Sequence, residues 1–394
     1  MTATRLWVLG VDSGGSGLRV ALGRGARGGG AVETVATRAF EEPVPTGPAG
    51  IDAARLLKRL VPAAESLLAA AGAAGGAGAA TLGAGAATLG AGADGNGPGR
   101  GLRDGRLGSP LSSEAVPRRE AGTARSAPSP GDAGAVGGPP VLAAVAVGAA
   151  GMAGLGDELR AVVPGALRDA LRVGRVALAS DAVTAYAGAL GQRPGTMVAA
   201  GTGVVALGTD LTCWRRADGW GHLLGDSGSG AWIGRAGLEA ALRAHDGRRG
   251  GSPALLGRAE AVFGPVAGLP GLLYPRQDRA AVLASFAPEV ARCAADDAVA
   301  AGILARAARH IAEAAAAVHP PGGAGDVALT GGLFRVGEPL LVPLRAELAE
   351  QLPGARPVPS AGDPLTGALA VAAALATGAL ALPREPGLLD TFGG

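Results

Sequence analysis

Three glycine-rich turns, each directly after an expected strand, constrain the fold of this chain more than any other feature. They are Gly10–Ser16, Gly201–Gly203 and Gly331–Gly332. Glycine lets a ligand approach the backbone closely, and successive amides can donate hydrogen bonds to phosphate oxygens. The turns therefore predict phosphate-binding loops. A tight hairpin turn accounts for the first of them equally well, since Asp-Gly and Gly-Gly sequences favour such turns.

Strands alternate with helices along the chain, which predicts α/β layers. The segments 5–23 and 196–208 each combine two strands with a glycine-rich turn, so we expect a duplicated unit with a cleft between its halves. The N-terminal lobe is expected over 1–195 and the C-terminal lobe over 196–394, with 363–394 packing back on the first. Other expected strands are 31–37, 141–148, 175–179, 326–329 and 356–358; the main expected helices are 51–70, 155–171, 181–190, 229–246, 253–262, 277–294 in pieces, 296–318, 337–351 and 363–378.

A low-complexity insertion interrupts the N-terminal lobe. Residues 69–140 contain 19 glycines and no aromatic residue, and AATLGAG occurs at 79–85 and again at 86–92. Two glycines per repeat argue against a coiled coil, since each costs about 1 kcal/mol relative to alanine in a helix. We therefore expect 72–138 to be a disordered Gly/Ala-rich insertion.

Charge and cysteine content exclude several classes of function. The net charge is +2, so no broad basic field is available for nucleic acid. The two cysteines, Cys213 and Cys293, form no disulfide framework or CxxC motif. The single lysine, Lys58, lies in no GxxxxGK[ST] sequence, which excludes a P-loop. No stretch suits a signal peptide or a membrane span, so we expect a cytoplasmic protein.

Taken together and in this order, the three turns resemble the phosphate-1, phosphate-2 and adenosine loops of the sugar kinase, heat-shock-protein and actin superfamily. This resemblance implies two actin-like, ribonuclease-H-like lobes with a cleft between them. It also implies ATP as co-substrate, bound by residues of all three turns. Those residues are Ser13, Gly14, Gly15, Ser16, Gly201, Thr202, Gly331 and Gly332.

Two carboxylates take roles in this resemblance. Asp12, at the end of the first strand, could hold Mg²⁺ through water. Asp181 follows a strand and starts a helix, at the place where sugar kinases of the superfamily hold the general base. Ser180 is expected to lie beside it in the substrate site. Alternatively, Asp181 is a helix N-cap, worth about 1 kcal/mol.

The segment Gly219–Arg235, GWGHLLGDSGSGAWIGR, closely resembles a signature of N-acetylglucosamine and glucosamine kinases within the BadF/BadG/BcrA/BcrD ATPase family. In that signature the aspartate of Gly-Asp-x-Gly-Ser binds sugar hydroxyls, which assigns Asp226 as a sugar ligand, with Thr202 and Gly203 beside it. Trp220 and Trp232 are more simply interpreted as core residues. The sequence departs from the family at Ser16, where Thr is commoner, and at Ser227, where N-acetylglucosamine kinases usually have Glu.

The resemblance implies an ATP- and Mg²⁺-dependent hexosamine kinase that phosphorylates the 6-hydroxyl of D-glucosamine, giving glucosamine 6-phosphate and ADP. An N-acetylglucosamine kinase is the alternative. A remote alternative is an ATPase that activates an iron–sulfur reductase, which would need cluster cysteines at a dimer interface. A sugar-responsive repressor would need an N-terminal helix-turn-helix, which we do not expect here because the first turn already begins at Gly10. We expect a homodimer with no nucleic-acid or membrane partner.

Overall fold

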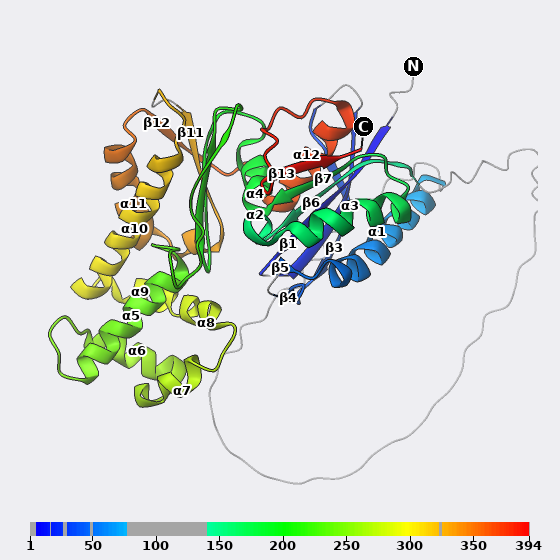
Figure 1. Ribbon diagram of the computed structural model, residues 1–394. Helices are drawn as coiled ribbons and strands as arrows, with labels where there is room; N and C mark the ends of the chain where they lie inside the picture. The colour runs from blue at the N-terminus through cyan, green and yellow to red at the C-terminus, as the bar shows by residue number, and fades with distance from the viewer. Residues whose placement is uncertain are drawn as a thin grey trace, which may run out of the picture. The chain divides into compact units, whose positions relative to one another are not determined.

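The computed structural model describes residues 5–15, 17–26, 30–47, 50–76, 140–322 and 325–393, and it is built on two mixed sheets (Figure 1). The first sheet has the strand order β13-β7-β6-β1-β2-β3. β1, β2 and β3 form an antiparallel meander, β6 and β7 continue it in parallel with β1, and β13 closes the edge antiparallel to β7. The strands are β1 (Arg5–Gly14), β2 (Gly17–Ala26), β3 (Glu33–Phe40), β6 (Leu142–Ala149), β7 (Val176–Ser180) and β13 (Leu389–Phe392).

The second sheet repeats this arrangement, with the order β10-β9-β8-β11-β12. β8, β9 and β10 form the antiparallel meander, and β11 and β12 run parallel to β8. The strands are β8 (Gly195–Ala200), β9 (Val204–Thr209), β10 (Trp214–Asp218), β11 (Gly325–Thr330) and β12 (Ala355–Pro359). The expected α/β class with two related lobes is confirmed.

Helices cover both faces of the first sheet because its strands alternate apolar side chains between two cores. Leu9 and Val11 of β1 face a core shared with α1 and α3, whereas Val8 faces one shared with α4 and α12. The helices are α1 (Ala53–Gly76), α2 (Met152–Leu155), α3 (Asp157–Leu171), α4 (Asp181–Leu190), α5 (Gly230–His245), α6 (Pro253–Phe263), α7 (Leu269–Leu273), α8 (Arg279–Ser285), α9 (Ala287–Cys293), α10 (Ala298–Val318), α11 (Glu338–Gln351) and α12 (Pro364–Thr377). Two short 3₁₀ turns, Val266–Gly268 and Gly332–Val336, and a small β4 (Thr46–Gly47)–β5 (Gly50–Ile51) ladder complete the described elements.

The core around α4 joins the two sheets. It contains Val8 of β1 together with Met197 of β8 and Ala328 of β11, packed with the fully buried Tyr186 of α4. A third core lies on the other face of the second sheet, where α5, α10 and α11 pack. Because a single core contains side chains of both sheets, the fold holds the carboxyl ends of strands from both lobes close to α4.

The end of the chain packs on the first sheet. α12 lies in the core with β1 and α4, and β13 pairs with β7 from Leu389↔Ala179 to Phe392↔Val176. Two glycines let α4 and α12 approach closely: a Cβ on Gly188 would lie 2.2 Å from the carbonyl oxygen of Asp363, and one on Gly367 would lie 1.9 Å from that of Thr184. The start of α12 is thereby fixed against the helix that begins at Asp181.

Several boundaries differ from those expected. Helix α1 runs to Gly76, so residues 72–76, which were expected to be disordered, are helical; the rest of the expected insertion lies outside the described residues. β10 and β13 were not expected, because WRRAD and LDTF are short and carry charges. In the described parts of the chain, no helix is both long and apolar enough to cross a membrane.

Candidate active site

Residues from both lobes line a cavity of about 700 Å³. Its lining includes most of the site residues expected from sequence: Asp12, Gly14, Gly15, Ser180, Asp181, Gly201, Gly203, Asp226 and Gly331. Ser13, Thr202 and Gly332 are described but do not line it, and Ser16 lies outside the described residues. The turns therefore converge on one site, although single positions within each turn differ.

Several of these residues converge because they lie at the carboxyl end of a strand or directly after it. Gly14 ends β1, Ser180 ends β7, Gly201 follows β8 and Gly331 follows β11. In open α/β sheets, ligands bind in the crevice outside these carboxyl ends. Gly331 has a φ of 107°, and a Cβ there would lie 2.2 Å from the carbonyl oxygen of Ala200, so this close approach of β8 and β11 requires glycine.

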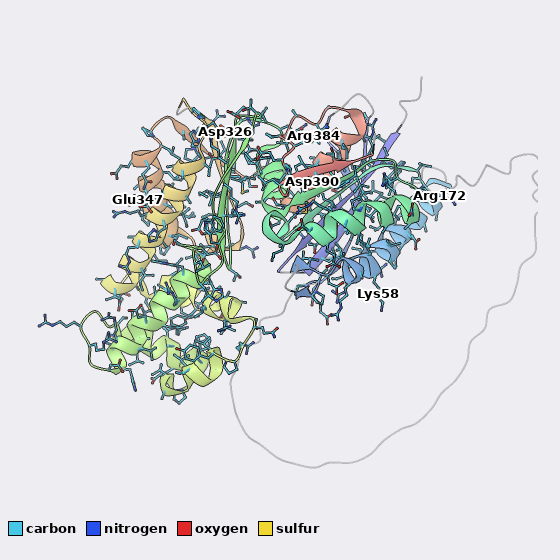
Figure 2. All side chains as sticks on the ribbon, viewed as in Figure 1. Lys58, Arg172, Asp326, Glu347, Arg384 and Asp390 are labelled. Carbon is cyan, nitrogen blue, oxygen red and sulfur yellow. The ribbon has the colours of Figure 1, made fainter. Side chains whose placement is uncertain are left out.

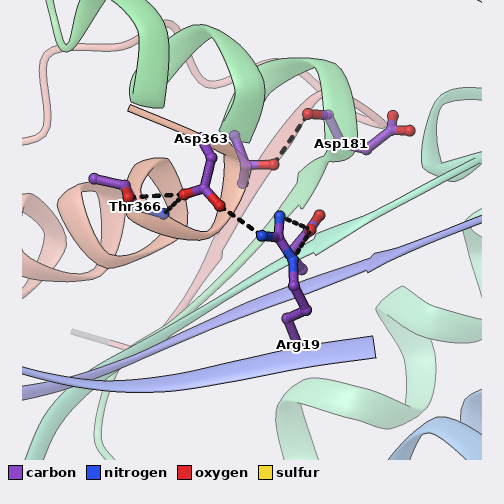
Figure 3. A network of polar contacts seen from close by, with 6 residues as sticks. Arg19, Asp181, Asp363 and Thr366 are labelled. Carbon is purple, nitrogen blue, oxygen red and sulfur yellow. Dashed lines mark hydrogen bonds and ion pairs between the residues drawn. The ribbon is translucent and has the colours of Figure 1, made fainter. Parts of the chain in front are cut away.

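The first turn is a hairpin turn and also lines the cavity. Its register places Asp12 directly opposite Arg19. The Arg19 Nε and Nη2 donate to Asp12 Oδ2 at 3.1 and 2.6 Å, and Nη1 donates to Asp363 Oδ2 at 2.5 Å. Figure 3 shows the Arg19 guanidinium beside the Asp363 carboxylate. This network ties the hairpin to the start of α12, because Asp363 is also the N-cap of that helix.

Asp12 is suited to hold magnesium in the indirect manner that this ion favours. Its side chain lines the cavity, and both contacts with Arg19 go to one oxygen, Oδ2. Mg²⁺ usually keeps several waters and is held by one or two carboxylates together with substrate phosphates. Within the described residues, no group of three or more His, Cys, Asp or Glu side chains forms a ready metal cage. The donor set therefore fits a magnesium ion brought in with a nucleotide.

Asp181 is the first residue of α4, and it is not the N-cap. Ser180 is the cap: its Oγ accepts a hydrogen bond from the Val183 amide at 3.3 Å. Asp181 Oδ1 accepts one from the amide of Ala182 at 2.9 Å, and its side chain lines the cavity. Burial, opposed by that hydrogen bond and reinforced by the negative charge of Asp12, raises the pKa of Asp181 from 3.8 to about 6. A carboxylate with such a pKa can accept a proton near neutral pH.

Asp226 is held in a tight loop at the other side of the cavity. It is 8% exposed and has a φ of 53°, a conformation that non-glycine residues seldom adopt. Asp218 stabilises this loop. The Asp218 Oδ1 accepts a hydrogen bond from the Asp226 amide at 2.6 Å, and the Asp218 Oδ2 accepts one from the Ser227 amide at 2.9 Å. A Cβ on Gly203 would lie 2.5 Å from Asp226 Oδ2, so this glycine makes room for the carboxylate. Burial raises the pKa of Asp226 as well.

The two tryptophans of the signature segment differ. Trp232 is partly buried against the core, as expected, and makes an edge contact with His310 at 5.2 Å between ring centroids. Trp220 is not a core residue: it is 69% exposed and lines the cavity. The expectation for Trp220 was wrong because the glycines around it form a surface loop instead of a packing contact.

Sequence reasoning missed Arg19, Arg216 and Asp218. The position of Arg19 could have been predicted, since a hairpin closed by Gly14 and Gly17 places residue 19 opposite residue 12. Arg216 and Asp218 lie on β10, a strand that no pattern indicated. Arg216 lines the cavity and donates to the carbonyl oxygens of Asp218 and Gly219. Ser13 is fully buried, and among the described atoms its Oγ has no hydrogen-bond partner.

Solved structures share this fold. A candidate N-acetylglucosamine kinase from Chromobacterium violaceum superposes with a TM-score of 0.55 at 24% identity, covering 92% of this chain and 98% of that one. A second candidate N-acetylglucosamine kinase, from Porphyromonas gingivalis, gives a TM-score of 0.52 at 14% identity, covering 92% of this chain and 96% of that one. At these identities the likeness establishes the two-lobed fold.

Sequence comparison gives a shorter match and a family. An N-acetylmuramic acid/N-acetylglucosamine kinase from Clostridium acetobutylicum is 34% identical over 106 residues, which are 27% of this chain and 34% of that protein. The match thus spans about a third of that relative's length. The family model named "BadF/BadG/BcrA/BcrD ATPase family" matches residues 9–372, and these include every residue of the cavity discussed above. The chain belongs to the BadF/BadG/BcrA/BcrD ATPase family.

Proposed function

We propose that this protein is an ATP-dependent kinase that transfers the γ-phosphoryl group to the 6-hydroxyl of an amino sugar. The observation that carries the proposal is Asp181, a carboxylate with a pKa of about 6, in a cavity also lined by the three glycine-rich turns. Phosphoryl transfer needs little covalent chemistry from the protein: it needs a proton acceptor, phosphate contacts and exact positioning. The cavity offers groups for each of these.

Asp181 would accept the proton of the attacking hydroxyl. Above pH 6 it is mainly ionised, and its hydrogen bond to the amide of Ala182 fixes the orientation of the carboxylate. Asp226, from the other lobe, would accept hydrogen bonds from the sugar hydroxyls and so hold the ring for attack. Its burial makes those hydrogen bonds strong, because few waters compete for a buried carboxylate.

The glycine-rich turns would hold the nucleotide. Gly14 and Gly15 on one side and Gly201 and Gly203 on the other would present amides to the phosphates, with Gly331 nearer the nucleoside. Ser13, Ser16, Thr202 and Gly332 stay predictions as nucleotide contacts, and Thr202 and Ser180 as substrate contacts. Asp12 would hold Mg²⁺ through water, and the ion would supply neutralisation of charge on the phosphates.

For the substrate we favour N-acetylglucosamine. The relatives support it by their names, and the size of the cavity and its exposed apolar side chains, Leu155 and Trp220, give room and contact for an acetyl group. Free glucosamine is the second candidate, because Asp181 and Asp226 would attract its ammonium group. Ser227, which stands where N-acetylglucosamine kinases usually have Glu, is not among the described residues that line the cavity, so this exchange does not favour either sugar.

Parallel steady-state assays test the proposal. ADP release would be measured with glucosamine, N-acetylglucosamine, N-acetylmuramic acid and glucose, each at several concentrations and with MgATP in excess. We expect at least about 10-fold higher kcat/KM for an amino sugar than for glucose, equivalent to about 1.4 kcal/mol of transition-state binding. ADP release that is independent of every sugar would exclude the kinase function.

The remaining predictions concern assembly and the remote alternative. Cys213 and Cys293 are partly buried, and neither is among the cavity residues. An iron–sulfur activator would bind iron, so iron analysis of the purified protein tests that function directly. The homodimer stays a prediction, which light scattering coupled to size-exclusion chromatography would check.

A further inference from the structure

The loop between β10 and α5 exposes an indole beside the carboxylate that we assign to the sugar. Trp220 lies between Gly219 and Gly221, whose φ values of 76° and 84° need glycine. The Gly221 amide donates to Asp226 Oδ1 at 3.2 Å. The same short loop therefore positions both the indole and Asp226, and both line the cavity.

Arg216 restricts the orientation of this indole. Its guanidinium carbon lies 5.2 Å from the centre of the Trp220 ring, and its Nη2 donates to the Gly219 carbonyl at 2.6 Å. A guanidinium over one face of the ring is a favourable cation–π contact. Even so, Trp220 is 69% exposed, so much of the ring is available to a ligand in the cavity.

An exposed indole keeps a large apolar surface in contact with water, and a ligand in the cavity can cover that surface. Most large aromatic side chains of a folded chain are buried, and Trp214 of the neighbouring strand is only 7% exposed. A pyranose ring has one face on which C–H groups are concentrated, and that face can cover an indole while the hydroxyls at the ring edge reach a carboxylate. Trp220 and Asp226 together offer this pair of contacts.

We propose that Trp220 is the platform on which the apolar face of the substrate's pyranose ring lies while Asp226 binds the hydroxyls of the sugar. This proposal rests on the proposed function. The platform acts on binding and orientation of the sugar. Its loss should therefore raise KM for the sugar, by about 10-fold, while KM for MgATP stays within about twofold, in the range measured for single aromatic stacking contacts.

The test uses Trp220→Ala, Trp220→Phe and the control Leu223→Ala. Leu223 is on the same loop, is 78% exposed and does not line the cavity in the described structure, so its loss should change neither KM. Trp220→Phe retains a ring and should lose less than Trp220→Ala. Circular dichroism and thermal melts of all variants would verify that they fold equally.

Tryptophan fluorescence provides a readout that needs no turnover. N-acetylglucosamine added to the wild type without nucleotide should change the emission, and the change should vanish in Trp220→Phe. A change caused by the non-hydrolysable ATP analogue AMPPNP alone, and by no sugar, would overturn the assignment. Normal sugar KM in Trp220→Ala overturns the platform but leaves the kinase intact, whereas a wild type that neither binds nor phosphorylates any sugar overturns both.

Discussion

Asp181 owes its reactivity to where the chain places it. The residue is at the first position of α4, where its burial and the charge of Asp12 disfavour ionisation, while the Ala182 amide and Arg216 favour it. The balance leaves the pKa near 6 and so gives a carboxylate that is basic enough to take a proton and ionised at neutral pH.

Asp181→Asn should therefore lower turnover by about 10²–10⁴ while the affinities for sugar and ATP stay nearly constant. The amide keeps the size and one acceptor oxygen, and it cannot accept the proton. Steady-state kinetics would measure kcat, and isothermal calorimetry would measure both affinities. Turnover close to that of the wild type would remove Asp181 from the mechanism.

In the wild type, kcat should fall as the pH is lowered through about 6, because the carboxylate of Asp181 is then protonated.

The same substitution should stabilise the protein in a defined pH range. The pKa of Asp181 is raised in the folded state, so the folded protein holds its proton more tightly than the unfolded chain does, and stability falls as the pH rises from about 4 to about 6. An asparagine has no such cost. The difference in melting temperature between Asp181→Asn and wild type should be small at pH 4 and positive at pH 8. A difference independent of pH would contradict the raised pKa.

Arg19 bridges two carboxylates that would otherwise face each other across the hairpin and α12 (Figure 3). Arg19→Lys keeps the charge but cannot form the two-pronged contact with Asp12 while also reaching Asp363. We expect KM for MgATP to rise about 10-fold, because Asp12 would lose its fixed orientation. Arg24→Lys is the control, since Arg24 lies on β2 as Arg19 does and pairs with the exposed Glu33 of β3. An unchanged KM for MgATP in Arg19→Lys would show that the bridge does not orient Asp12.

The sequence predicts the backbone of this site better than its side-chain contacts. The sequence marks the glycine-rich turns that contain Gly14, Gly201 and Gly331, all three of which line the cavity, because the residue type that a turn needs is a local property. The exposure of Trp220 and the burial behind the pKa of Asp181 depend on contacts between distant segments. No single-residue pattern carries that information.

Among the elements, the crossing of α4 and α12 fixes the site. Gly188 and Gly367 let the two backbones approach, and Asp363 caps α12 where it meets Arg19. Gly367→Ala would place a methyl group 1.9 Å from the Thr184 carbonyl oxygen, so α12 must shift. We expect a destabilisation of about 1–3 kcal/mol and a loss of turnover.

Gly165→Ala is the matched control for that crossing. Gly165 lies inside α3, and a Cβ there meets nothing within 4 Å. This substitution should stabilise the protein by up to about 1 kcal/mol, because alanine is the better helix former. Urea denaturation of both variants would measure the difference. Equal effects of the two substitutions would mean that α4 and α12 do not pack as closely as the structure has them.

Long periodic elements were predicted well, whereas the short edge strands β10 and β13 were not. The helix expected at 296–318 is α10, from Ala298 to Val318, and the strand expected at 326–329 is β11. β13 has four residues, and its place beside β7 depends on pairing across more than 200 positions. Pairing of that kind follows from the packing of α12 against the first sheet, which local propensity does not contain.

At the scale of the whole molecule, two sheets of the same topology present their strand ends to one cavity. The first lobe supplies Asp12 of β1 and Asp181, which directly follows β7, and the second lobe supplies Gly201, Gly331 and the loop that contains Asp226. Lys58, the chain's single lysine, is on α1 and outside the cavity lining (Figure 2). The duplication could be predicted from the two strand hairpins. The position of α4 in a core shared by both sheets could not be predicted, because the apolar residues of a helix do not show which elements will pack against them.

The final prediction concerns residues 77–138, which interrupt the chain between α1 and β6. The described residues on either side complete the first sheet and its two cores without them, since β6 pairs with β1 and α1 packs on the same core. Replacing 77–138 by a flexible Gly/Ser linker of about 15 residues, which spans roughly 20 Å on average, should leave turnover within a few-fold. The melting temperature should be retained or rise, because a shorter flexible connection costs less entropy to close. Kinetics and thermal unfolding of the deletion variant would decide, and a large loss of turnover in a folded variant would mean that the segment contributes to the site.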